Sequence, residues 1–161
     1  VLFNHSIDDV HPESSAHISD CGGDEERGKF RFILDLLEEF PNMKITLFIT
    51  PNCVDKPNDH GLKKLIKKVL KLNYTNMWDD NPFRLDKHLE WCNWLGSYVD
   101  KGVFELGIHE YYHHNINGVS VNHSMEFVGL SYSEYVRRVK LSEEIPRKVG
   151  LRFSKVFRPP G

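Results

Sequence analysis

Side chains that could bind and use a metal ion follow three of the apolar stretches in this sequence. An Asp8-Asp9 pair follows the first stretch, His109 and His113 follow another, and Arg158 follows the last. One carboxylate and two imidazoles can hold a divalent ion and leave a position open for water. The ion brings the pKa of that water toward about 7, and a second carboxylate can accept its remaining proton. An arginine nearby keeps that carboxylate ionised.

Each of these residues, taken alone, has an ordinary explanation. An Asp-Asp pair at a strand end usually faces solvent, a single histidine is more often a surface or core residue, and a single arginine usually caps a structure. Adjacent strand residues point to opposite faces, so Asp8 and Asp9 can share one site only if the strand stops there. The metal hypothesis therefore depends on all five residues lying together.

The alternation of strands and helices predicts how these distant residues meet. β-Branched and aromatic runs indicate strands, and apolar positions repeating every three or four residues indicate helices. Strands are expected at residues 1–7, 44–50, 103–108 and 153–157, and helices at residues 25–40, 61–72, 84–100 and 131–149. This order indicates an α/β fold with a parallel sheet. Ligands bind such sheets beyond the carboxyl ends of the strands, where the candidate residues lie.

Specific residues mark the expected helix ends. Asp24 is a suitable N-cap for the first helix, and Pro41 ends that helix. Ser131 and Glu134 form a capping box at the start of the last helix. Pro146 should kink or shorten the same helix.

The composition indicates a single globular domain over residues 1–161. Lys and Arg number 21 and Asp and Glu number 23, so the formal charge of −2 gives no electrostatic indication of nucleic-acid binding. The apolar runs are much shorter than the roughly 20 residues of a membrane span. Three cysteines without a C-x-x-C pair argue against a zinc ribbon or a redox motif. The chain opens directly in an apolar stretch and stops immediately after another, so we expect the domain to be truncated at both ends.

Three motifs give the chain a resemblance to a known family. They are SIDDVHP (Ser6 to Pro12), GIHEYYHH (Gly107 to His114) and FRPPG (Phe157 to Gly161). In the same order, they resemble the T-F-D-D-G-P, H-[ST]-x-x-H and R-P-P-Y-G motifs of the polysaccharide deacetylase superfamily, the chitooligosaccharide-deacetylase-like carbohydrate esterases. The resemblance spans the whole chain and is to a divergent branch of that superfamily.

The resemblance implies a function and a role for each candidate residue. It implies a metal-dependent hydrolase, with Zn²⁺ as the expected ion, that removes acetyl groups from N-acetylated or O-acetylated carbohydrate. Asp8 takes the role of catalytic base, and Arg158 orients it. Asp9, His109 and His113 take the role of metal ligands. The implied fold is an irregular (β/α) barrel, of which this chain supplies the first half to two-thirds.

The chain departs from the family pattern at three positions. Val10 stands in place of a glycine, Glu110 in place of Ser or Thr, and Gly161 in place of a tyrosine. Glu110 adds a negative charge beside the metal. The family's last motifs, which supply a histidine general acid, have no match, so we expect this acid C-terminal to residue 161.

Other assignments fit part of the same pattern. His11, His17 and His123 are candidate substitutes for the general acid, and His114 competes with His113 as a ligand. The alternative functions are another amide or imide hydrolase on the same scaffold, a non-haem Fe(II) oxygenase with a two-His-one-carboxylate triad, and a degenerate carbohydrate-binding domain.

Aromatic residues extend the expectation to the substrate. Tyr111 and Tyr112 lie in the site loop, where their rings could stack on a sugar. Trp91, Trp94 and Tyr98 form a helical stripe that favours burial against a neighbour. The expected partner is a carbohydrate or a small acetylated substrate, with no nucleic acid and no membrane span.

Overall fold

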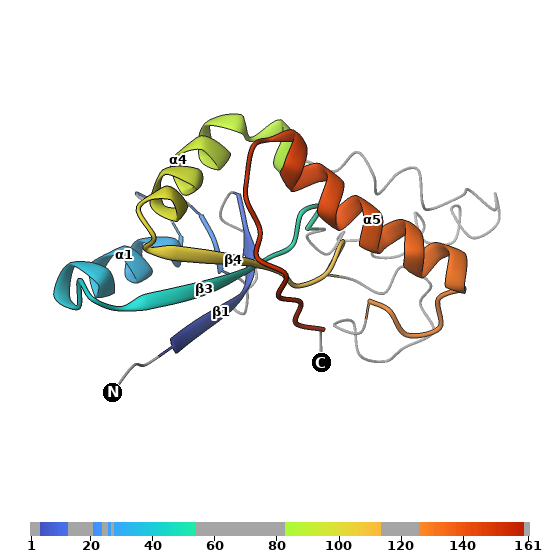
Figure 1. Ribbon diagram of the computed structural model, residues 1–161, viewed down its shortest axis with the longest axis horizontal. Coiled ribbons are helices and arrows are strands. Elements are labelled where there is room, and N and C mark those ends of the chain that lie inside the picture. Colours follow the sequence, from blue (N-terminus) through green and yellow to red (C-terminus); the bar gives the residue numbers. More distant parts are fainter. Residues whose placement is uncertain are drawn as a thin grey trace, which may run out of the picture.

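Strands and helices alternate along the chain, as the sequence predicts. The computed structural model describes residues 4–12, 21–23, 26, 28–53, 83–113 and 126–159. The elements are β1 (Asn4–His11), β2 (Cys21–Gly22), α1 (Phe30–Glu39), β3 (Lys44–Ile49), η1 (Leu85–Lys87), α4 (Leu89–Asp100), β4 (Phe104–Ile108) and α5 (Tyr132–Lys148) (Figure 1). Element η1 is one turn of 3₁₀ helix.

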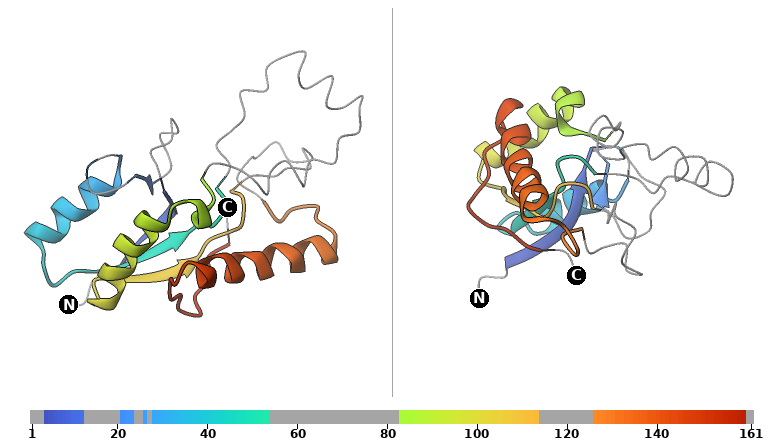
Figure 2. Two further views of the ribbon diagram at one scale, coloured as in Figure 1. Left: turned by 90° about the horizontal axis from the view of Figure 1, so that it is seen from above. Right: turned by 90° about the vertical axis from the view of Figure 1, so that its right-hand side faces the viewer.

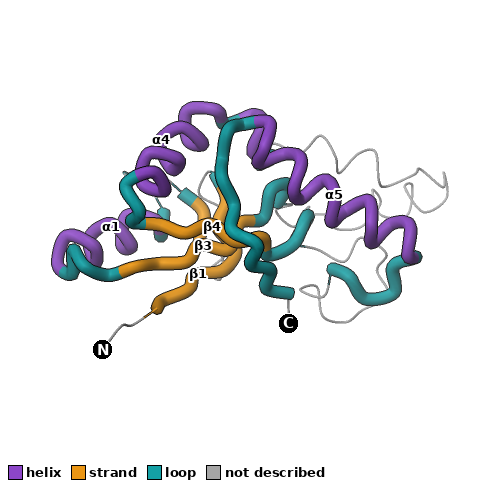
Figure 3. Tube along the Cα trace, in the orientation of Figure 1, coloured by secondary structure: helices purple, strands orange, loops and turns teal. Residues whose placement is uncertain are grey.

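A parallel sheet with the strand order β2-β1-β3-β4 lies at the centre of the molecule. Strands β1, β3 and β4 run side by side in the tube view of Figure 3. Every residue of β3 after Lys44 is buried, as is typical of a strand covered on both faces. Ile49 and Ile108 pair at the ends of β3 and β4, so the segments that follow them start at one edge of the sheet.

Aromatic side chains hold α1 and α4 against this sheet. The fully buried ring of Phe30 lies 6.4 Å from Trp91, 5.1 Å from Trp94 and 5.8 Å from Phe104, measured between ring centroids. Tyr98 packs against both Trp94 and Phe104. The aromatic stripe of α4 therefore packs in the core, as predicted.

Helix α5 begins with the predicted cap, because the Ser131 hydroxyl accepts a hydrogen bond from the Glu134 N–H at 3.3 Å. Pro146 lies in the last turn, and the helix ends at Lys148. Figure 2 shows α5 and α1 at opposite ends of the described part of the molecule.

The first helix and the first strand differ from their predicted bounds. Helix α1 begins at Phe30, later than expected, and the proposed cap Asp24 lies outside the described residues. Strand β1 continues through the Asp8-Asp9 pair to His11, so the predicted strand end at residue 7 is wrong.

The last predicted strand and the barrel are also not observed among the described residues. Residues 153–157 run beside β4 but form a single bridge, between Ile108 and Phe157. The described strands form an open sheet and do not close a barrel. The helix predicted at residues 61–72 lies outside the described part of the chain. Among the helices that the structure describes, none combines the length and the apolar character that crossing a membrane requires.

We predict that Phe30→Ala lowers the free energy of unfolding by about 3–5 kcal/mol, because it opens a cavity between α1, α4 and β4. The matched control is Phe32→Ala on the same helix. Phe32 is 73% exposed, so its replacement should change stability by less than about 0.5 kcal/mol. Urea unfolding of the two variants measures both values, and equal losses would contradict the packing described here.

Candidate metal centre

A bulge in β1 brings the Asp8-Asp9 pair to the edge of the sheet. The pairing of β1 with β3 is regular up to Ile7 and resumes at Val10 with a shifted register. Asp9 has a φ of 59°, which is unusual for a residue other than glycine. A bulge interrupts the alternation of side chains, so two neighbouring residues can serve the same side of a strand. The bulge, and not the end of the strand, thus allows both aspartates to lie near one site.

His109 directly follows β4, and its backbone and side chain are both fixed. Its N–H donates to the carbonyl oxygen of Ile49 at 3.0 Å, and its Nδ1 donates to the carbonyl oxygen of Arg158 at 2.8 Å. Because a carbonyl only accepts, this contact places a proton on Nδ1 and directs Nε2 to the site. Nε2 lies 3.1 Å from Asp9 Oδ1.

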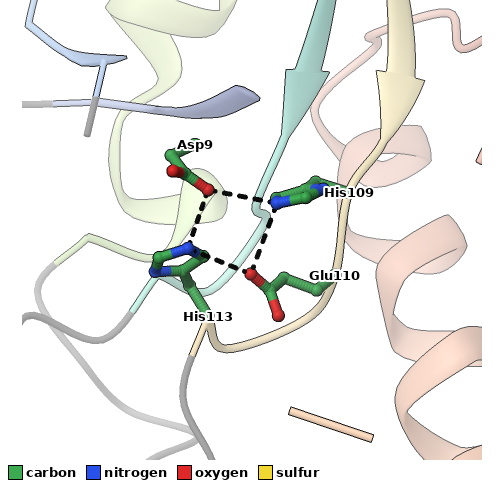
Figure 4. A group of neighbouring side chains, drawn as sticks. All are labelled: Asp9, His109, Glu110 and His113. Atoms are coloured by element: carbon green, nitrogen blue, oxygen red, sulfur yellow. Dashed lines mark ion pairs between the residues drawn. The ribbon is translucent and has the colours of Figure 1, made fainter. Parts of the chain in front are cut away.

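His113 and Glu110 approach the same point from the loop after β4 (Figure 4). His113, with a φ of 58°, places Nε2 at 2.8 Å from Asp9 Oδ1. Oε1 of Glu110 lies 3.6 Å from His109 Nε2 and 3.3 Å from His113 Nε2. The four ligand atoms all lie within 4.8 Å of one another.

These distances fit the ligand shell of a metal ion. Two atoms bound at about 2.0–2.1 Å to one tetrahedral ion lie about 3.3 Å apart. The four nitrogen–oxygen distances range from 2.8 to 3.6 Å. Neither oxygen of Glu110 has a hydrogen-bond partner among the described residues, although both are buried. The donor set is thus suited to hold a divalent cation.

The charges of the cluster are strongly coupled. Burial alone would raise the pKa of Asp9, but its contacts with His109 and His113 outweigh burial and hold this pKa well below its usual range. Burial would lower the pKa of His109, and Asp9 reverses this effect, so the pKa is raised. Burial, and then the nearby carboxylates of Glu126 and Asp9, raise the pKa of Glu110.

Asp8 and Arg158 form a pair next to this cluster. Arg158 Nη1 donates to Asp8 Oδ1 at 2.8 Å, and the guanidinium lies over the ring of Phe48, 4.7 Å from its centroid. The two charged side chains remain 43% and 38% exposed, so the pair contributes little to stability. Its effect is to orient Asp8, whose charge also helps to raise the pKa of His109.

A buried carboxylate supports the loop that carries the ligands. Oε2 of Glu126 accepts hydrogen bonds from the N–H groups of Tyr111, Tyr112 and His113, at 2.9, 2.7 and 3.2 Å. Oε1 of Glu126 pairs with Arg138 Nη1 at 3.0 Å, and both side chains are fully buried. The loop therefore has a defined shape at His113, where φ is positive.

Helix α5 anchors this support through Arg138. Arg138 Nε donates to Glu134 Oε1 at 2.8 Å, and its guanidinium lies 4.9 Å from the ring centroid of Tyr112. Arg137 donates to the hydroxyl of Tyr112 at 3.2 Å. The contacts connect α5 to the site loop, so the position of the helix helps to determine where His113 lies.

Sequence reasoning missed Glu126 and Arg138 and misjudged two tyrosines. Tyr111 and Tyr112 are 1% and 0% exposed, so their predicted stacking on a sugar is wrong. A signal for Arg138 was present, because it shares one face of α5 with Ser142 and Ile145, which are buried. Glu126 had no comparable pattern around it.

Four histidines were alternatives to the general acid or to the ligand His113, and the structure describes one of them. His11 is fully buried, and its Nδ1 donates to the carbonyl oxygen of Pro12 at 2.8 Å, so it does not face solvent. His17, His114 and His123 lie outside the described residues.

The fold and the site together define a parallel α/β domain with a candidate metal centre at the carboxyl ends of its strands. Comparison of the chain with models of protein families, with curated proteins and with solved structures found no match. The function must therefore be argued from the site itself.

We predict that Glu126→Gln lowers the free energy of unfolding by about 3–5 kcal/mol, because it removes the fully buried partner of Arg138 and leaves that guanidinium with Glu134 alone. Glu144→Gln, at an exposed position of the same region of the chain, is the control and should change stability by less than about 0.5 kcal/mol. Urea unfolding in the presence of a chelator measures the difference without a contribution from bound metal. A loss as small as that of the control would show that the pair does not support the loop.

Proposed function

We propose that this protein is a metal-dependent hydrolase that removes acetyl groups from N-acetylated or O-acetylated carbohydrate. The observation that carries the proposal is the meeting of Asp9, His109 and His113 at one point, with Asp8 beside them on Arg158. These five residues come from the three motifs that resemble polysaccharide deacetylases. The proposal includes Zn²⁺ as the ion, because two imidazoles and a carboxylate suit zinc.

The chain's own residues would have two roles, to bind the ion and to accept a proton from water. Asp9, His109 and His113 would hold the ion, which supplies a Lewis acid and an acidified water. Asp8 would accept the proton of the attacking water, because it lies beside the cluster on Arg158 and is not among the four clustered residues. Arg158 would hold the Asp8 carboxylate in place through its 2.8 Å hydrogen bond.

The substrate would approach at the carboxyl ends of the strands. Strands β1 and β4 deliver the ligands there, and catalytic residues of parallel α/β folds usually lie on that side. The exposed parts of Asp8 and Arg158 would face it. The proposal also includes the irregular (β/α) barrel of the family, with the sheet β2-β1-β3-β4 as its first part.

We predict that Asp8→Asn lowers acetate release by about 10²–10⁴-fold while the protein still binds one zinc ion, because the base is lost and the ligands remain. The assay uses zinc-loaded protein with N-acetylated chitooligosaccharides and an O-acetylated polysaccharide, together with metal analysis of each variant. His109→Ala is the control, and it should lose both the metal and the activity.

Two results would contradict this assignment. Loss of zinc from Asp8→Asn with retention by Asp9→Asn would reverse the roles of the two aspartates. Equal zinc content in the wild type and in His109→Ala would show that the protein has no metal centre at His109, and the hydrolase proposal would then be wrong.

A further inference from the structure

We propose that Glu110 is a fourth protein ligand of the ion, beside Asp9, His109 and His113. The inference rests on the proposed metal-dependent function and adds to it. The resemblance to polysaccharide deacetylases implies only three protein ligands, and the motif of that family has Ser or Thr at the position of Glu110. The evidence for a fourth ligand comes from the burial, the contacts and the position of the Glu110 side chain.

The first argument is that the Glu110 carboxyl group is buried without a hydrogen bond to the part of the chain that the structure describes. Its side chain is 0% exposed, and neither oxygen has a hydrogen-bond partner among the described residues. Buried carboxylates are normally paired with a cation or bound to a metal. The nearby buried cation, Arg138, is directed to Glu126 and Glu134 instead. A metal ion would supply a positive charge to this carboxyl group, which among the described residues faces only the two imidazoles.

The second argument is the direction of the side chain. Oε1 of Glu110 lies 3.3 Å from His113 Nε2 and 3.6 Å from His109 Nε2, and thus faces the same atoms that face Asp9. The four residues form a closed ring of contacts in Figure 4. Glu110 thus presents an oxygen to the same space that Asp9 and the two imidazoles enclose.

The third argument is the backbone that presents the residue. His109, Glu110 and His113 lie on one short loop, and Glu126 fixes that loop through three N–H groups. The loop can therefore supply three of the four ligands with little freedom to rearrange. Two carboxylates and two neutral imidazoles would balance the charge of a divalent ion, and a bound water would then be a fifth ligand.

The test compares metal binding by the wild type, Glu110→Gln and the exposed control Glu144→Gln, with Zn²⁺ and Co²⁺ as the probes. Glu110→Gln should weaken Zn²⁺ binding by more than about 100-fold, since loss of a ligand should exceed the 10–100-fold effect of an outer-shell partner. The visible spectrum of bound Co²⁺ should also change. Glu144→Gln should match the wild type in both measurements.

Glu110→Ser, which introduces the type of residue found in the family, is the second variant. It should still bind Co²⁺ through the three other ligands, more weakly and with an altered spectrum. Thermal unfolding in chelator shows whether each variant is folded. A crystal structure of the zinc-loaded wild type gives a measurement that needs no variant, and Glu110 should lie within about 2.2 Å of the ion.

The failure of this inference is distinct from the failure of the proposed function. Glu110 is not a ligand if Glu110→Gln binds Zn²⁺ as tightly as the wild type while His109→Ala does not bind, and the three-ligand centre then stands. A Glu110–zinc distance above about 3 Å leads to the same conclusion. If the wild type binds neither ion, both the inference and the metal-dependent function are wrong.

Discussion

Burial of carboxyl groups next to the sheet is the constraint on which the rest of this structure depends. The side chains of Asp9 and Glu110 are 15% and 0% exposed, and Glu126 is buried behind them. Carboxylates at such positions cost several kcal/mol each unless a cation or several donors compensate them. The chain compensates Glu126 with Arg138 and three N–H groups, and Asp9 with two imidazoles. The arrangement of α5 and of the site loop follows from these pairings.

The backbone is unusual at two of the four clustered residues. Asp9 and His113 are the described residues other than glycine with positive φ, and such conformations cost about 1–3 kcal/mol each. Both are held by their surroundings, Asp9 by the bulge between β1 and β3 and His113 by the hydrogen bond to Glu126. The structure thus maintains strain where ligand atoms converge, which agrees with a functional site more than with simple packing.

The sequence was a good guide to the regular elements and to the clustered residues. Runs of β-branched and aromatic residues located β3 and β4, and the capping box located the start of α5. The position of polar residues after predicted strands indicated that Asp9, His109 and His113 would meet. The bulge could not be predicted, because it depends on the pairing of β1 with a strand far along the chain. The partnership of Glu126 with the site loop is likewise a long-range pairing, and no local pattern encodes it.

Arg158 binds two neighbouring residues, one through its side chain and one through its main chain. Its guanidinium holds Asp8, whereas its main-chain oxygen holds the ring of His109. Only the first of these contacts depends on the identity of the side chain, since every amino acid offers a carbonyl. Exchange of the residue at this position would therefore release Asp8 while the imidazole kept its orientation. A displacement of the whole segment, by contrast, would disturb both neighbours at once.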